Sequence, residues 1–171
     1  MALTPSTMVP LGTRHPDFQV VDVATGETLA WEDVAGPKGT LILFICAHCP
    51  FVTHVEEGLV RLGKDSIPRG IGILGISSND AQTHPGDGPK GLLAQSQRAK
   101  FPFPYGYDED QSAAIPFQAA CTPDLFLDEA EGRLAYRGQV DDSRPGNGIP
   151  VTCHERILAI DWLLAKELPP Q

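Results

Sequence analysis

The feature that most restricts the fold is an apolar run, Thr40–Ile45, in which polar and apolar residues do not alternate. Strands with one face in water alternate, whereas strands covered on both faces do not. A second buried strand is expected at Gly70–Ser77. Between them, residues 50–63 repeat apolar side chains at spacings of three and four, which predicts an amphipathic helix. This order of elements predicts an α/β fold whose sheet is covered on both faces.

Further strands are expected on either side of this central unit. Asp17–Val23 and Thr28–Trp31 flank a turn and predict an N-terminal β-hairpin extension. Asp124–Leu127 and Arg133–Arg137 flank a charged turn with a glycine and predict a second hairpin, so the sheet should be mixed. The remaining expectations are helices at 90–100 and 151–166, a helix start at Asp108-Glu109-Asp110, and loops at 78–89 and 141–150.

Composition sets the size and class of the protein. Its 171 residues suit one domain, and we expect an irregular N-terminal arm at 1–14 and a single domain at 15–168. Acidic residues outnumber Lys and Arg, 22 to 13, which argues against nucleic acid because its binders need clustered basic side chains. The longest apolar run, Leu41–Ala47, is far shorter than the ~20 residues that cross a bilayer, and 1–16 lack a signal-peptide core. We therefore expect no membrane contact and a cytoplasmic location.

A cysteine motif, Cys46-Ala47-His48-Cys49-Pro50, stands where the buried strand ends and the predicted helix begins. A helix N-terminus carries unpaired N–H groups and roughly half a positive charge, which stabilise a thiolate. We therefore expect the pKa of Cys46 to lie below its usual ~8.5, making Cys46 the nucleophile and Cys49 the resolving thiol. Protonated His48 should stabilise the same thiolate and make the disulfide more oxidising. Pro50 suits the first helical turn, where its missing N–H costs little.

The motif resembles the thioredoxin-like superfamily, specifically the redoxin branch shared by alkyl hydroperoxide reductase/thiol-specific antioxidant (AhpC/TSA) proteins and small thiol–disulfide oxidoreductases. A second motif, Cys121-Thr122-Pro123-Asp124, precedes a predicted strand, where these proteins carry a cis-proline. Pro16-Asp17-Phe18 and Tyr136-Arg137-Gly138-Gln139 also look like this branch, so the resemblance spans roughly 15–166. It implies a thioredoxin-like fold with a cis Thr122–Pro123 bond whose backbone docks the substrate.

The activity that the resemblance implies is thiol–disulfide exchange in cell redox homeostasis, with Cys46 and Cys49 forming the redox-active disulfide. The implied partners are a disulfide-containing protein or small thiol/disulfide substrate and a reducing or oxidising partner, and no cofactor is implied. Peroxide-reducing relatives carry Thr or Ser three positions before the nucleophile, where this chain has Leu43. A thiol-dependent peroxidase is therefore the alternative within the family. The strand before the motif also lacks the buried carboxylate of thioredoxin, for which Asp124 or Glu56 could substitute.

The other two cysteines leave further alternatives open. Cys121 precedes the docking Thr122, so it is either a third redox thiol or a small buried side chain. For Cys153, near the last helix, we expect no role. The alternative from another class is a metal-binding module, in which Cys46, His48, Cys49 and Cys121 would hold Zn²⁺ or Cu⁺. Because no second pair of ligands has zinc-knuckle spacing, we assign no metal ligand.

Overall fold

A computed structural model describes residues 9–138, 140 and 142–166. Seven strands form one mixed sheet in the order β2-β1-β5-β4-β3-β6-β7. The central strands β3 (Gly39–Phe44), β4 (Ile71–Ser77) and β5 (Tyr105–Tyr107) run parallel to one another. The hairpin of β1 (Val20–Asp22) and β2 (Thr28–Leu29) adds to β5, and the hairpin of β6 (Asp124–Glu129) and β7 (Leu134–Gly138) adds to β3. Both expected hairpins are confirmed.

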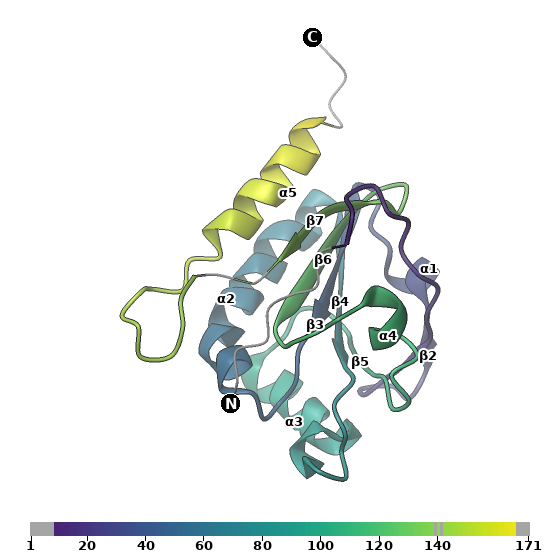
Figure 1. Cartoon of the computed structure of the whole chain (residues 1–171), viewed down its shortest axis with the longest axis vertical. Coiled ribbons are helices and arrows are strands. Elements are labelled where there is room, and N and C mark those ends of the chain that lie inside the picture. Colours follow the sequence, from purple (N-terminus) through teal and green to yellow (C-terminus); the bar gives the residue numbers. More distant parts are fainter. Residues whose placement is uncertain (1–8, 139, 141, 167–171) are drawn as a thin grey trace.

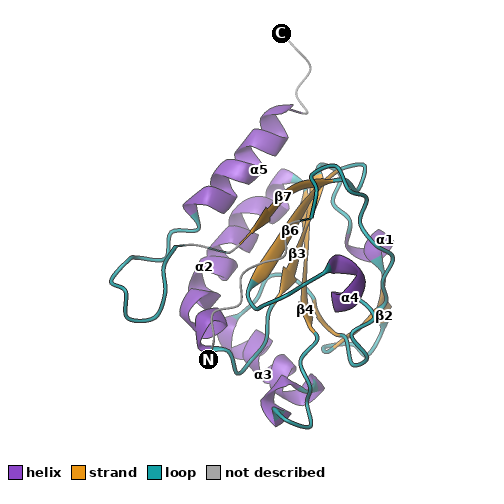
Figure 2. Cartoon of the chain, viewed as in Figure 1, coloured by secondary structure: helices purple, strands orange, loops and turns teal. Residues whose placement is uncertain are grey.

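Helices cover both faces of this sheet, as the apolar strand pattern requires. Helices α2 (Pro50–Ser66) and α5 (His154–Lys166) lie against one face, and the short α1 (Trp31–Val34) and α4 (Ala114–Phe117) lie against the other (Figure 1). Alternate residues of β3 enter two separate cores: Leu41 and Leu43 pack with α2 and α5, whereas Ile42 and Phe44 pack with an aromatic cluster near α4. Figure 2 shows the resulting three layers, with the strands between the two sets of helices. The predicted thioredoxin-like α/β fold is thereby confirmed.

Several element boundaries differ from the sequence expectations. Asp108 does not begin a helix: its buried carboxylate accepts hydrogen bonds from the amides of Ala113 and Ala114 and the Ser78 hydroxyl, and α4 starts only at Ala114. The expected loop at 78–89 contains the 3-10 turn η2 (Pro85–Asp87), which leads into α3 (Pro89–Ala99). The terminal helix begins at His154, not at residue 151. Residues 1–8 of the predicted arm and 167–168 of the predicted domain lie outside the described residues.

Candidate active site

The cysteine motif lies at the junction of β3 and α2, at one end of the central strands. Cys46 follows β3, Cys49 is the N-cap residue of α2, and Pro50 is the first helical residue. Pro50 fits there because its ring preorganises the backbone and its missing N–H would have no partner in the first turn. Both cysteines are thiols, and both are buried. The strand-to-helix placement expected from the sequence is therefore what the structure contains.

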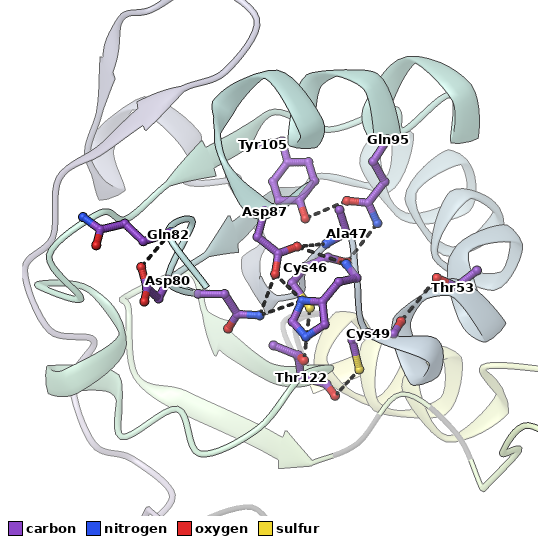
Figure 3. Close-up of polar contacts among 12 residues, drawn as sticks. Cys46, Ala47, Cys49, Thr53, Asp80, Gln82, Asp87, Gln95, Tyr105 and Thr122 are labelled. Atoms are coloured by element: carbon purple, nitrogen blue, oxygen red, sulfur yellow. Dashed lines mark hydrogen bonds and ion pairs between the residues drawn. The ribbon is translucent and has the colours of Figure 1, made fainter. Parts of the chain in front are cut away.

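The second motif lies directly against the two thiols. The Thr122–Pro123 peptide bond is cis, as the resemblance implied. The Cys46 Sγ lies 3.5 Å from the Thr122 Oγ1, and the Cys49 Sγ lies 3.6 Å from the Thr122 carbonyl oxygen (Figure 3). Asp124, which directly follows Pro123, forms a buried ion pair with Arg137 at 2.9 Å and so fixes the end of the cis-proline loop. The structure thus brings together four of the predicted site residues, although the two motifs are more than 70 residues apart.

A buried carboxylate does lie beside the motif, and it comes from neither position considered above. Asp87, in η2, is completely buried, and its Oδ1 accepts the amides of Ala47 at 2.7 Å and His48 at 3.0 Å (Figure 3). Its Oδ2 accepts a hydrogen bond from Asn79 at 3.1 Å and another from the His48 Nδ1. Burial acts to raise the pKa of Asp87, but these hydrogen bonds outweigh it and hold the pKa below its usual value. The residue therefore stays charged and organises the loop between the two cysteines.

His48 faces this carboxylate from the rim of the site. Its side chain is 29% exposed, and its ring stacks on that of His84 with the centroids 3.8 Å apart. Since the Nδ1 is bonded to Asp87, the positive charge of a protonated His48 would be compensated mainly by that carboxylate. The direct partner of the His48 ring is therefore the Asp87 carboxylate, and the predicted effect of His48 on Cys46 stays a prediction.

The lowered pKa that we expected for Cys46 belongs to Cys49 instead. The pKa of Cys46 is raised, first because its thiol donates a hydrogen bond to Cys49, then by burial, and further by the charge of Asp87. The pKa of Cys49 is lowered to about 5, mainly by that same hydrogen bond, with smaller contributions that include the amides of Phe51 and Val52 in the first turn of α2. The main physical reason is therefore the hydrogen bond between the two thiols, and the amides of the first turn of α2 add to the stabilisation of charge on Cys49.

A second polar network supports Cys46 from the side of α3. Gln95, itself buried, donates a hydrogen bond to the Cys46 carbonyl oxygen at 3.0 Å and another to Glu56 at 3.1 Å. The side-chain amide oxygen of Gln95 accepts a hydrogen bond from the buried Tyr105 hydroxyl at 2.9 Å (Figure 3). Glu56 also binds Arg98 through both carboxylate oxygens, each at 3.0 Å. Because Glu56 is paired with Arg98 and Asp124 with Arg137, neither is an unpaired carboxylate below the thiols.

The remaining cysteines lie in different surroundings. Cys121 is half-buried and directly precedes the loop that carries the cis-proline. Cys153 is buried beside α2, where a β-carbon added to Gly58 would lie 2.8 Å from its sulfur. Gly58 is more than two helical turns from Cys49, so Cys153 is remote from the thiol pair. Among the described residues, one set could hold a metal ion, namely Cys46, His48 and Asp87, and it does not include Cys121.

Local sequence patterns identify the two cysteines but not their buried partners. Asp87 lies in a segment rich in Gly and Pro that indicates only a loop, and Gln95 is one polar residue of an otherwise ordinary helix. Pro85-Gly86-Asp87 is a common turn signal. None of these signals points to a contact with residues about 40 to 49 positions earlier in the chain.

Comparisons with known proteins bear on the family and the fold of this chain. The model of the AhpC/TSA family matches residues 11–137. An uncharacterised conserved protein from Geobacillus kaustophilus is 44% identical and superposes with a TM-score of 0.92, covering 98% of this chain and 88% of that one. A hypothetical protein from Sinorhizobium meliloti 1021 is 38% identical with the same TM-score, covering 96% and 89% of the two chains. No curated protein matches the chain.

More distant structures share the fold. A putative thiol:disulfide interchange protein from Chlorobium tepidum is 13% identical, with a TM-score of 0.72 over 92% of this chain and 99% of that one. At this identity the likeness establishes only the architecture, which is the thioredoxin-like arrangement already described. Among the helices of the described residues, none combines the length and apolar character that a bilayer crossing requires.

Proposed function

Because the chain belongs to the AhpC/TSA family, whose members are oxidoreductases, we propose that it is a thiol–disulfide oxidoreductase. The observation that carries the proposal is the placement of two thiols, Cys46 and Cys49, against the carbonyl and hydroxyl groups of Thr122 in a cis-proline loop. Two thiols one helical turn apart can form an intramolecular disulfide with little movement. Such a pair can exchange two electrons with a partner without any cofactor.

The exchange proceeds in two steps whose atoms and electrons balance. The Cys46 thiolate attacks one sulfur of the substrate disulfide, so that a Cys46–substrate bond forms and the substrate disulfide breaks, releasing the first substrate thiolate. Cys49 then attacks the Cys46 sulfur, which forms the Cys46–Cys49 disulfide and releases the second substrate thiolate. The dithiol loses two electrons, the substrate gains two, and the two cysteine protons end on the substrate thiols. In a reducing cytoplasm a second partner would regenerate the dithiol.

The site residues support different parts of this exchange. The two cysteines share one proton through their hydrogen bond, so Cys49 carries the negative charge of the free pair and takes the Cys46 proton as Cys46 attacks the substrate. The amides at the N-terminus of α2 stabilise charge on Cys49 once Cys46 is engaged with the substrate. We assign the docking of the substrate backbone to Thr122 and Pro123, and the adjustment of the redox potential to His48 through Asp87. A peroxidase role has less support, because Leu43 is a buried apolar residue of β3.

The test is to trap the intermediate. In Cys49→Ser, Cys46 can attack but the intermediate cannot be resolved, so the variant should accumulate a covalent adduct with a model protein disulfide. In Cys46→Ser the adduct should be absent, and both variants should lose reduction of the disulfide. Cys153→Ala, which is remote from the pair, is the matched control and should behave as the wild type.

Two results would count against the proposal in different ways. An adduct that forms in Cys46→Ser but not in Cys49→Ser would exchange the roles of the two thiols. Full reductase activity in both variants would remove the pair from the mechanism altogether. Hydrogen peroxide offered to the same variants tests the family alternative, because a peroxidase would consume it with Cys46 intact and Cys49 replaced.

A further inference from the structure

Three different donor groups converge on one point beside the thiol pair. The donor atoms of Cys46, His48 and Asp87 all lie within 4.8 Å of one another. Cys46 and Asp87 are buried, while His48 lies at the rim, so the set has one side towards solvent. Since Cys49 forms a hydrogen bond with Cys46, a second sulfur lies next to the set. We propose that the reduced protein binds a borderline-soft divalent cation, Zn²⁺, through Cys46, His48 and Asp87.

The geometry of the donors is close to what this ion needs. Zn²⁺ binds thiolate sulfur at about 2.3 Å and imidazole nitrogen or carboxylate oxygen at about 2.0–2.2 Å, in a tetrahedron. In such a tetrahedron neighbouring donor atoms are about 3.4–3.6 Å apart, so donors that are now up to 4.8 Å apart have to approach by up to about 1.4 Å, and the His48 Nδ1 and the Asp87 oxygen have to separate. The ion replaces the hydrogen bond between the His48 ring and Asp87 and lies between these two groups once they have moved apart. The fourth position belongs to Cys49 or to a water molecule.

The surroundings of the donors hold them in place, as in established zinc sites. One oxygen of Asp87 is bound by the two loop amides, which leaves the other to face the ion. Asn79 donates a hydrogen bond to that second oxygen and so orients the carboxylate. The ring of His48 is held flat by its stacking on His84. Such outer contacts fix the direction of metal ligands and raise their affinity.

The charge balance also favours a cation. Binding exchanges the Cys46 proton for the ion, so that a zinc–thiolate bond forms and one proton is released to solvent. The ion then neutralises a thiolate and a buried carboxylate that would otherwise repel each other. A coordinated thiol is deprotonated by the metal itself.

This site would make the exchange reaction sensitive to metal, an inference that rests on the proposed function. Coordination to zinc withdraws electron density from the Cys46 sulfur and lowers its nucleophilicity towards a substrate disulfide, so the metal inhibits exchange reversibly. Oxidation of Cys46 and Cys49 to a disulfide removes the sulfur donor and releases the ion. The metal and the disulfide therefore compete for the same sulfur.

The experiment measures zinc binding directly on the full chain. Reduced protein is titrated with Zn²⁺ in competition with a chromophoric chelator, and Co²⁺ absorption reports thiolate coordination and tetrahedral geometry. We expect one Zn²⁺ per reduced chain and none on the disulfide form. His48→Ala and Asp87→Asn should each weaken binding at least ~10-fold, since even the loss of an outer contact has that effect. The matched controls His154→Ala and Asp80→Asn, both at exposed positions, should bind as the wild type does.

The outcomes separate this inference from the proposed function. It is overturned if the reduced wild type does not bind Zn²⁺, or if His48→Ala binds it within ~10-fold of the wild type, which would indicate a simple dithiol. Because His48 lies at the rim, this variant keeps the test valid even if Asp87→Asn fails to fold. Disulfide reduction is measured separately on metal-free protein. Activity without zinc binding rejects only the metal site, and zinc binding without activity rejects only the proposed function.

Discussion

Gln95 offers the sharpest test of how the fold holds the reactive cysteine. Its side chain makes three hydrogen bonds, to the Cys46 carbonyl oxygen, to Glu56 and from the Tyr105 hydroxyl. Gln95→Leu has a similar size but removes all three. Glu56 keeps both of its bonds to Arg98, so the groups that lose a buried partner are the Cys46 carbonyl and the Tyr105 hydroxyl.

The expected loss of unfolding free energy in Gln95→Leu follows from those two groups. A buried polar group that loses its partner costs about 1–3 kcal/mol, so two of them cost about 4 kcal/mol. The apolar surface of the new Leu side chain offsets about 1 kcal/mol of this loss. We therefore expect the free energy of unfolding to fall by about 3 kcal/mol. Urea unfolding followed by fluorescence and circular dichroism measures it.

The matched control is Gln97→Leu, an exposed glutamine two positions further along the same helix. There the same substitution removes no buried hydrogen bond, and the change should stay within about 0.5 kcal/mol. The reactivity of the thiol pair towards a small aromatic disulfide should also fall in Gln95→Leu, because the backbone of Cys46 loses its anchor. Equal unfolding free energies for the two variants would refute the reasoning.

Three further predictions concern stability. Burial raises the pKa of Asp128 to about 7, above the ~3.9 of an unfolded Asp, so the free energy of unfolding is highest below pH 4 and falls as the pH rises through 7. Asp128→Asn should remove this pH dependence and be more stable than the wild type by up to about 4 kcal/mol above pH 7. Parallel stability profiles of the two proteins from pH 4 to 8 would contradict this prediction. Arg137→Met should cost about 3–5 kcal/mol in urea unfolding because it removes the buried ion pair between Arg137 and Asp124, and adding Asp124→Asn should recover part of the loss. Gly72→Ala should lower the melting temperature, since overpacking costs about 1–3 kcal/mol and its β-carbon would lie 1.9 Å from a carbonyl oxygen of α1, while Gly86→Ala, with open space around it, should leave it unchanged.

The fold was predictable because hydropathy patterns are local. The unbroken apolar run of β3 and the helical spacing after it identify a covered strand and the helix that packs on it, whatever the rest of the chain does. The two hairpins were equally visible from their turns. The predicted helix start at Asp108 was wrong for a physical reason. An acidic residue that begins a helix and one that accepts hydrogen bonds from amides five and six residues later look the same in the sequence.

The site could be predicted only in part. By itself the sequence determined that Cys46 and Cys49 stand where a buried strand meets a helix, since strand, cysteine and helix signals are contiguous. The tertiary structure alone determined that Asp87 takes the loop amides, that Gln95 anchors the Cys46 carbonyl, and that the lowered pKa belongs to Cys49. A buried polar group must find a partner, but which partner it finds depends on how distant segments pack. Local sequence patterns therefore do not predict which partner a buried polar group finds.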